Sequence, residues 1–320
     1  MKKLLKIVFC LMLSAVFCFG FTACNNDDGS TGNKNTSIKK RGDTYVLNVY
    51  ATSYGEDGKA DTVFDGDDLK YTTKSGDVVD VTIIGANAFK GNDTLETIVI
   101  PSTVTEIGAG AFAEMTALKT LELPFAGSKL DAVNEARLIG YLFGTEAYDG
   151  GIACTQTVSP AADSSAEATT SVYYLPQTLT TIKINYTGSD AYTLPQYTFS
   201  GLSVTDIQLS GNITKIDNGA FKGSYIYSID IPASVTEIGD EAFASCPRLT
   251  EVDFSANTVL ETLGNKAFLS FKGVSLTFPA SLNSVGDYCF ENSTASQITI
   301  PNTNCVYGVH PFNGCDNLPL

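Results

Sequence analysis

A six-residue pattern recurs along the chain and constrains its fold more than any other feature. It consists of an aliphatic residue, in most copies a glycine, two variable residues, a small residue and a phenylalanine. The motif phenylalanines follow one another at spacings of 23, 31, 56, 22, 22, 25, 22 and 22 residues. A recurring period of 22 residues predicts a repeat protein whose units stack on one another. Clear copies are Ile84–Phe89, Ile107–Phe112, Ile216–Phe221, Ile238–Phe243, Leu263–Phe268 and Val285–Phe290, and weaker copies end at Phe143, Phe199 and Phe312.

A second element precedes each linker and alternates apolar with polar residues. Such alternation predicts a short strand with one buried face, and the proline that follows ends the strand. We therefore expect an α/β solenoid in which each unit has one short parallel strand and one compact turn or short helix. Phe89, Phe112, Phe221, Phe243, Phe268 and Phe290 should then stack in one buried column. The alternating stretches are Leu95–Pro101, Leu118–Pro124, Tyr227–Pro232, Ser275–Pro279 and Gln297–Pro301.

These units resemble the BspA-like, or Treponema pallidum-type, leucine-rich repeat. The resemblance lies in Leu249–Phe254 (LTEVDF) for the strand and Ile238–Phe243 (IGDEAF) for the turn, and it extends from about Val81 to the C-terminus. It implies a surface or secreted protein that binds by adhesion rather than a catalyst. The implied partner is a host matrix or cell-surface protein, or another bacterial cell.

The N-terminus has the features of an export signal. Three lysines precede an apolar run, Ile7–Phe21, which is too short to be a confident membrane-spanning helix. The run leads into Thr22-Ala23-Cys24, which resembles the lipobox of bacterial lipoproteins. We expect residues 1–23 to be a signal peptide, Cys24 to be lipidated and residues 24–40 to be a flexible tether. An ordinary signal peptide or an uncleaved anchor is the alternative.

The remaining chain divides into a cap and a solenoid. Residues 41–80 lack the repeat but contain strand-like stretches at Tyr45–Tyr50 and Leu69–Tyr71, as expected for a cap that hides the open end of an array. The leucine-rich-repeat solenoid should occupy residues 81–320. Residues 145–172 are rich in Ala, Ser, Thr and Gly, and we expect them to form an inserted loop. That loop is either a second binding contact or a tolerated insertion.

The overall charge restricts the possible partners. The formal net charge is −15, which argues against a nucleic-acid binder because such proteins need a basic surface. Like-charged copies repel one another, so a monomer is expected. The predicted location is the bacterial cell surface, with the lipid anchor in the outer membrane if the cell has one.

Few residues are suited to catalysis or metal binding. The single histidine, His310, lies at a variable position of the last motif, and no Cys-x-x-Cys pair is present. Cys246, Cys289 and Cys315 occupy columns filled in other units by packing residues. A bridge between Cys305 and Cys315 stays open. We expect no catalytic residue, no metal and no cofactor.

Arg41-Gly42-Asp43, at the end of the tether, matches the tripeptide that integrins read. A match of three residues occurs often by chance, so a function for it stays open.

The outward positions of the predicted strands supply the candidate binding surface. Acidic side chains gather there, which suits a basic partner surface, although charge that merely keeps the protein soluble is the alternative. Two other functions stay open: a carbohydrate-active enzyme that uses a pair such as Asp230 and Asp253, or a structural part of a surface assembly. The predicted binding residues are Asp206, Gln208, Ser228, Asp230, Glu251 and Asp253.

Overall fold

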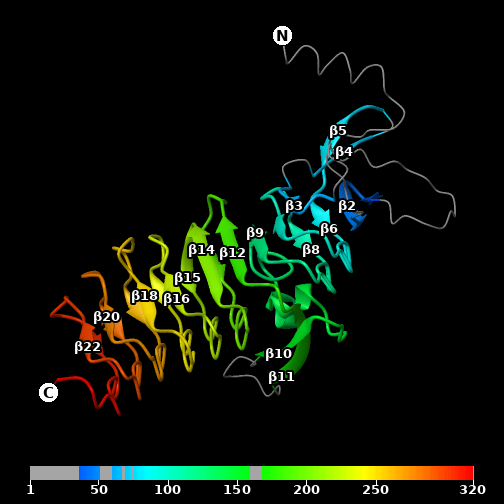
Figure 1. Cartoon of the computed structure of the whole chain (residues 1–320). Coiled ribbons are helices and arrows are strands. Elements are labelled where there is room, and N and C mark those ends of the chain that lie inside the picture. Colours follow the sequence, from blue (N-terminus) through cyan, green and yellow to red (C-terminus); the bar gives the residue numbers. More distant parts are fainter. Residues whose placement is uncertain (1–35, 51–59, 67–68, 74, 159–167, 320) are drawn as a thin grey trace, which may run out of the picture.

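The structure is a computed structural model that describes residues 36–50, 60–66, 69–73, 75–158 and 168–319. The expected signal peptide, Cys24 and most of the expected tether lie outside the described residues. The described chain forms an elongated stack of turns that runs from the N-terminal strands to the C-terminal end (Figure 1). One hydrophobic core runs through this stack.

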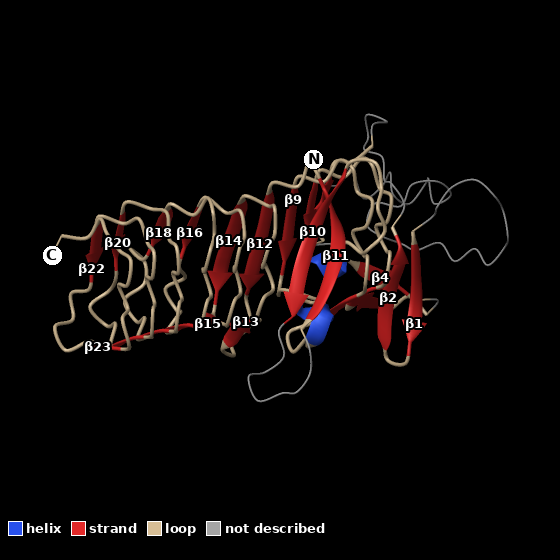
Figure 2. Cartoon of the chain, turned by 90° about the horizontal axis from the view of Figure 1, so that it is seen from below, coloured by secondary structure: helices blue, strands red, loops and turns tan. Residues whose placement is uncertain are grey.

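Regular units contribute one strand to each of two sides of the stack, and neighbouring units pair in parallel (Figure 2). We call these the front strands and the back strands. The front strands are β3 (Val63–Phe64), β7 (Thr97–Val99), β9 (Thr120–Leu123), β12 (Thr181–Tyr186), β14 (Asp206–Gly211), β16 (Ser228–Asp230), β18 (Glu251–Asp253), β20 (Ser275–Thr277) and β22 (Gln297–Thr299). The back strands are β6 (Ile83–Ile84), β8 (Glu106–Ile107), β13 (Tyr192–Leu194), β15 (Ile213–Ile216), β17 (Glu237–Ile238), β19 (Thr262–Leu263), β21 (Ser284–Val285) and β23 (Val306–Tyr307).

The expectation of an α/β unit is wrong, and the protein is a β-solenoid. Within the described ranges the only helices are two 3₁₀ helices, η1 (Asn134–Arg137) and η2 (Gly140–Leu142). The motif turns contain a left-handed residue two positions before the phenylalanine and another two positions after it, and a right-handed helix cannot run through such residues. In the unit of Phe243, for example, Glu241 has a φ of 54° and Ser245 a φ of 55°. The same pair of positions has positive φ around Phe89, Phe112, Phe199, Phe221, Phe268, Phe290 and Phe312.

The glycines of the motif are required because successive turns touch through their backbones. A Cβ on Gly239 would lie 2.5 Å from Oδ1 of Asn218, and one on Gly264 would lie 2.5 Å from the backbone nitrogen of Asp240. Neither glycine has a positive φ, so close approach rather than backbone conformation selects it. Any side chain at these positions would push the units apart.

Side chains of the residue after this glycine position link successive turns. Oδ1 of Asn218 accepts a hydrogen bond from the backbone N–H of Asp240 at 2.8 Å, and Oδ1 of Asp240 accepts one from Asn265 at 2.6 Å. Oδ1 of Asn265 accepts from Asp287 at 2.8 Å, and Oδ1 of Asp287 accepts from Val309 at 2.6 Å. We call this series the Asn/Asp ladder. It fixes each turn to the next along the last five motif units.

The predicted phenylalanine column is confirmed. Before the insertion and after it, neighbouring rings of the column lie 5.0 to 6.1 Å apart between centroids. At the N-terminal end, Tyr50 and Phe64 cover the last ring, with centroids 5.0 and 5.2 Å from that of Phe89. The six rings predicted to be buried are each at most 1% exposed: Phe89, Phe112, Phe221, Phe243, Phe268 and Phe290.

The N-terminal strands cover the start of the stack. An antiparallel hairpin of β1 (Ser37–Arg41) and β2 (Thr44–Val49) joins the back strands through parallel pairing of β2 with β6. A second hairpin consists of β4 (Lys70–Thr72) and β5 (Val78–Asp80). The expected strand stretches are present as β2 and β4.

The tripeptide Arg41-Gly42-Asp43 forms the exposed tip of the first hairpin. Gly42 has a φ of 63°, and Oγ1 of Thr44 donates a hydrogen bond to the carbonyl of Arg41 at 2.8 Å. A two-residue hairpin turn requires glycine at this first central position. Turn geometry therefore accounts for Gly42.

The stretch expected to be a loop at 145–172 contains the first strand and part of the second strand of a hairpin. Strands β10 (Gly151–Val158) and β11 (Thr169–Pro176) pair in an antiparallel manner and project from the side of the stack (Figure 1). Buried positions alternate along β10 at Cys154, Gln156 and Val158. The sequence concealed this strand because its central buried residue is a glutamine.

Gln156 replaces backbone hydrogen bonds where the hairpin interrupts the stack. Its side chain is fully buried, and its Oε1 accepts a hydrogen bond from the N–H of Gly140 at 2.8 Å. Its Nε2 donates to the carbonyls of Thr198 and Ser200 at 3.1 and 3.0 Å. In this way one side chain joins the turn before the insertion to the turn after it.

We expect Phe243→Ala to lower the free energy of unfolding by about 3–5 kcal/mol, because it removes a buried ring from the middle of the column. Urea denaturation followed by circular dichroism measures this change. An effect below about 1 kcal/mol would contradict a stability role for the column.

We expect Gln156→Leu to lower the free energy of unfolding by at least about 3 kcal/mol. The substitution keeps the volume of the side chain but leaves three buried backbone groups without partners, each of which costs about 1–3 kcal/mol. Thr157→Ala, on the exposed face of the same strand, is the matched control and should change stability little. Equal stability of the two variants in urea titrations would rule out the joining role.

Candidate functional site

The outward side chains of the front strands form the two predicted columns. On β16, β18 and β20 an exposed residue alternates with a buried one, because Ile229, Val252 and Leu276 point into the core. Rigid parallel strands hold the exposed neighbours at fixed positions, so this face is a preorganised surface.

The structure brings four of the six predicted binding residues together in register. Ser228 lies opposite Glu251, and Asp230 lies opposite Asp253, on the paired strands β16 and β18. Asp230, Glu251 and Asp253 are exposed, and none of them has an ion pair within the described part of the chain. We call these three residues the acidic strip.

The other two predicted residues are set apart from this strip. Strands β14 and β16 are neighbours but belong to separate ladders, and a groove of about 580 Å³ lies along them. Oδ2 of Asp206 accepts hydrogen bonds from Oγ1 of Thr181 at 3.1 Å and from Nε2 of Gln208 at 2.8 Å. The carboxylate of Asp206 is thus engaged within the protein, and Gln208 serves to orient it.

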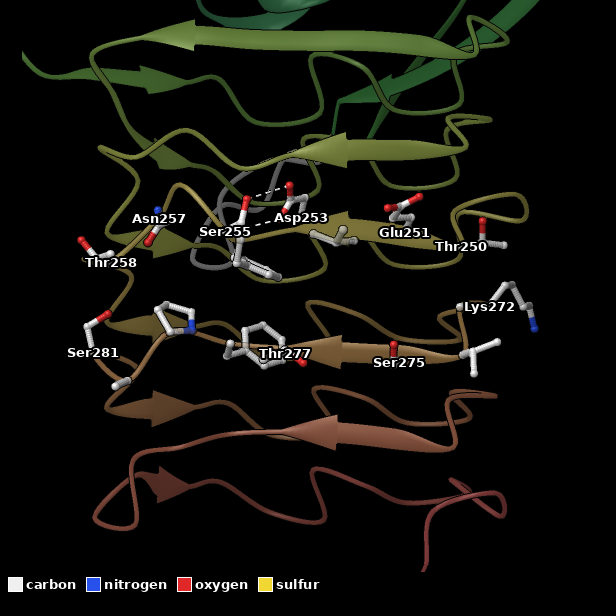
Figure 3. Close-up of a pocket in the computed structure, with 17 residues that line it drawn as sticks. Thr250, Glu251, Asp253, Ser255, Asn257, Thr258, Lys272, Ser275, Thr277 and Ser281 are labelled. Atoms are coloured by element: carbon white, nitrogen blue, oxygen red, sulfur yellow. Dashed lines mark hydrogen bonds between the residues drawn. The ribbon is translucent and has the colours of Figure 1, made fainter.

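A larger groove lies along β18 and β20 (Figure 3). These strands also belong to separate ladders, and the groove has a volume of about 810 Å³. The unit between Phe243 and Phe268 has 25 residues instead of 22, and the longer loop after β18 lines the groove at Ser255 and Thr258. The extra residues of this unit coincide with the break in the front side.

The long loop is held in place by its own hydrogen bonds. The carboxylate of Asp253 accepts from the N–H of Ser255 at 2.7 Å and from its hydroxyl at 2.9 Å (Figure 3). The amide of Asn257 is buried and donates to the carbonyls of Pro232 and Val235, both at 2.8 Å. The wall of the groove is therefore fixed before any partner arrives.

Sequence reasoning missed a cluster of large side chains at the start of β16 and β18. Tyr225 and Tyr227 are 42% and 51% exposed. The guanidinium carbon of Arg248 lies 5.6 Å from the ring centroid of Tyr225 and 5.5 Å from that of Tyr227. Both tyrosines precede the strand proper, so an inspection of the strand columns alone does not find them.

The described cysteines and the histidine are poorly suited to catalysis. Burial raises the pKa of the thiols of Cys154 and Cys246 to about 11, so both are protonated and unreactive at neutral pH. Burial also raises the pKa of Cys289. Cys305 and Cys315 are free thiols, and no bridge joins them. His310 is an exposed turn residue with a φ of 48°.

Two further searches covered the described ranges. They contain no group of three or more His, Cys, Asp or Glu side chains that could hold a metal ion. Among the same residues no helix is long and apolar enough to cross a membrane.

The family of the chain follows from its repeats. A model described as a BspA type leucine rich repeat region matches six copies over residues 70–134 and 192–319, which is more than half of the chain. The chain belongs to the BspA-type leucine-rich-repeat family, as its resemblance to that family predicted. Residues 135–191, which the match omits, include the inserted hairpin and β12.

Several solved structures are similar to this chain. A leucine-rich repeat protein from Bacteroides ovatus is 21% identical over 91% of this chain and 70% of its own, with a TM-score of 0.42. One from Eubacterium ventriosum is 20% identical over 52% of this chain and 43% of its own, with a TM-score of 0.37. A leucine rich cell surface protein from Faecalibacterium prausnitzii is 20% identical over 92% of this chain and 82% of its own, with a TM-score of 0.33. No curated protein matches the chain.

Proposed function

We propose that this protein is a lipid-anchored cell-surface protein that binds a partner protein through the front face of its solenoid. The observation that carries the proposal is the exposed acidic strip on two paired, rigid front strands, bordered by the groove along β18 and β20. The partner is a host matrix or cell-surface protein, or a protein on another bacterial cell.

Rigidity supports binding by this face. The front strands are held by stacked turns, so their outward side chains lose little conformational freedom when a partner docks. Membership of a family of repeat proteins agrees with a binding module. The proteins reported above are repeat proteins, and none of them is described as an enzyme.

The groove favours a protein partner over a glycan substrate. The exposed side chains along it are carboxylates, hydroxyls and a lysine, as Figure 3 shows for Glu251, Ser275 and Lys272. Its two aromatic rings, Phe254 and Phe278, are 5% and 2% exposed, so they offer no platform on which a sugar could stack. The alternative of a carbohydrate-active enzyme therefore lacks support at this place.

The proposed location rests on the N-terminal sequence and on the family. Cys24 follows a lysine-led apolar run, and a lipidated cysteine would hold the solenoid outside the cell on a polar tether. One of the similar structures is described as a leucine rich cell surface protein. The anchor would lie in the outer membrane if the cell has one.

We expect the combined variant Asp206→Asn, Asp230→Asn, Glu251→Gln and Asp253→Asn to associate about tenfold more slowly with its partner at low salt. Exposed acids steer a basic surface towards the strip, and salt screens this attraction over about 8 Å at physiological ionic strength. Binding kinetics on a panel of matrix proteins and bacterial cells, at low and high salt, measure the effect.

A matched control removes the same number of charges elsewhere. Glu106→Gln, Asp131→Asn, Glu261→Gln and Asp316→Asn change exposed acids outside the front strands and should leave association unchanged. If the two combined variants associate at the same rate, the acidic strip is only solubilising charge.

We expect Cys24→Ser to release the protein from membranes or to leave the precursor unprocessed, because serine has no thiol to carry the lipid. Fractionation of cells, together with the mass of the mature chain, tests this. Unchanged processing and unchanged membrane association in the variant would refute the anchor.

A further inference from the structure

Two tyrosines and one arginine form a compact exposed cluster beside the acidic strip. The guanidinium of Arg248 lies over both rings, and its Nη1 donates a hydrogen bond to the hydroxyl of Tyr227 at 2.8 Å. Backbone contact continues the cluster into the groove, because the N–H of Thr250 donates to the carbonyl of Tyr227 at 3.0 Å and Thr250 lines the groove. We call Tyr225, Tyr227 and Arg248 the tyrosine–arginine cluster.

Arg248 is held in position but remains available to a partner. Arginine carries five N–H donors, and within the described part of the chain only the bond to Tyr227 is made by this side chain. No carboxylate of the described residues forms an ion pair with it. A planar guanidinium with free donors matches a carboxylate through two parallel hydrogen bonds.

The surroundings of the cluster combine apolar area with both signs of charge. Val274, at the same end of the groove as Lys272, is 74% exposed. Exposed tyrosine and arginine side chains of this kind dominate the energetics of protein interfaces. Glu251 follows Arg248 by three residues, so the two positions are at most about 10 Å apart along the chain.

We propose that the tyrosine–arginine cluster is the anchor of the binding face, and that it receives a carboxylate of a partner protein segment whose neighbouring basic side chains face the acidic strip. This inference rests on the proposed function, because it assigns the partner chemistry of the same face. The segment carries an acidic residue about three positions from a lysine or arginine, with an apolar side chain that contacts the tyrosines.

Charge complementarity favours such a mixed segment over a polyanion. Asp230, Glu251 and Asp253 lie on the strands that begin at the cluster, and they repel a sulfated glycan or another chain of negative charges. A purely basic segment satisfies the acidic strip but is repelled by Arg248 and Lys272. A segment with one acid next to basic residues satisfies both rows at once.

The test is a double-mutant cycle between the protein and synthetic peptides. Three twelve-residue peptides share one tyrosine: one has a single Glu three positions from two lysines, the second has Gln in place of that Glu, and the third is acidic throughout. The first peptide should bind the wild-type chain at least tenfold more tightly than either of the others, measured by fluorescence anisotropy. With Arg248→Gln, the first and second peptides should bind equally.

Matched variants separate the role of Arg248 from a loss of charge or of folding. Lys40→Gln also removes a cation that lies over a tyrosine ring, 6.0 Å from the centroid of Tyr45, but does so on β1 and should leave all three affinities unchanged. Tyr227→Phe keeps the ring but removes the hydrogen bond to Arg248, and it should weaken the first peptide about threefold.

Three results would overturn the inference: equal binding of the first and second peptides to the wild type, tightest binding of the acidic peptide, or no binding of any peptide. If the second peptide binds as tightly as the first and loses affinity in the combined acid variant, the cluster is not the anchor while the acidic strip still binds. Loss of that strip effect as well would remove the proposed function too.

Discussion

Direct contact between the backbones of successive turns is the constraint on which the rest of this structure depends. The amide of each motif phenylalanine donates to the next unit, as Phe221 does to Ala242 and Phe243 to Ala267, both at 2.8 Å. Turns this close leave no room for a Cβ at Gly239 or Gly264. The ring column, the parallel strands and the flat front face all follow from that separation, because each unit repeats the path of the one before it.

The sequence predicted the period, the strands and the buried rings because each leaves a mark at a fixed interval. Apolar positions on either side of Asp230 and Asp253 recur with the unit, and the rings of Phe243 and Phe268 recur in the same column. The conformation of the turn leaves a weaker mark. Glu241 and Ser245 are left-handed although neither is glycine, so side-chain identity alone did not exclude a short helix.

The candidate site was predicted in part for a similar reason. Alternation placed the acidic strip on exposed positions, and the structure puts Asp230 opposite Asp253. The groove along β18 and β20 depends on how three extra residues are accommodated, which the spacing of 25 does not specify. The tyrosine–arginine cluster depends on contact between neighbouring units at positions outside the strands. Gln156 was missed because its three hydrogen bonds join turns that are distant in sequence.

The Asn/Asp ladder has a consequence for how such proteins change over generations. Each rung accepts from the unit ahead through a side chain of the same kind, from Asn218 to Asp287, so every unit presents matching ends to its neighbours. Duplication or loss of a whole unit leaves no unmatched group at the new junction. The molecule can therefore lengthen or shorten in steps of about 4.8 Å while its surface columns stay aligned.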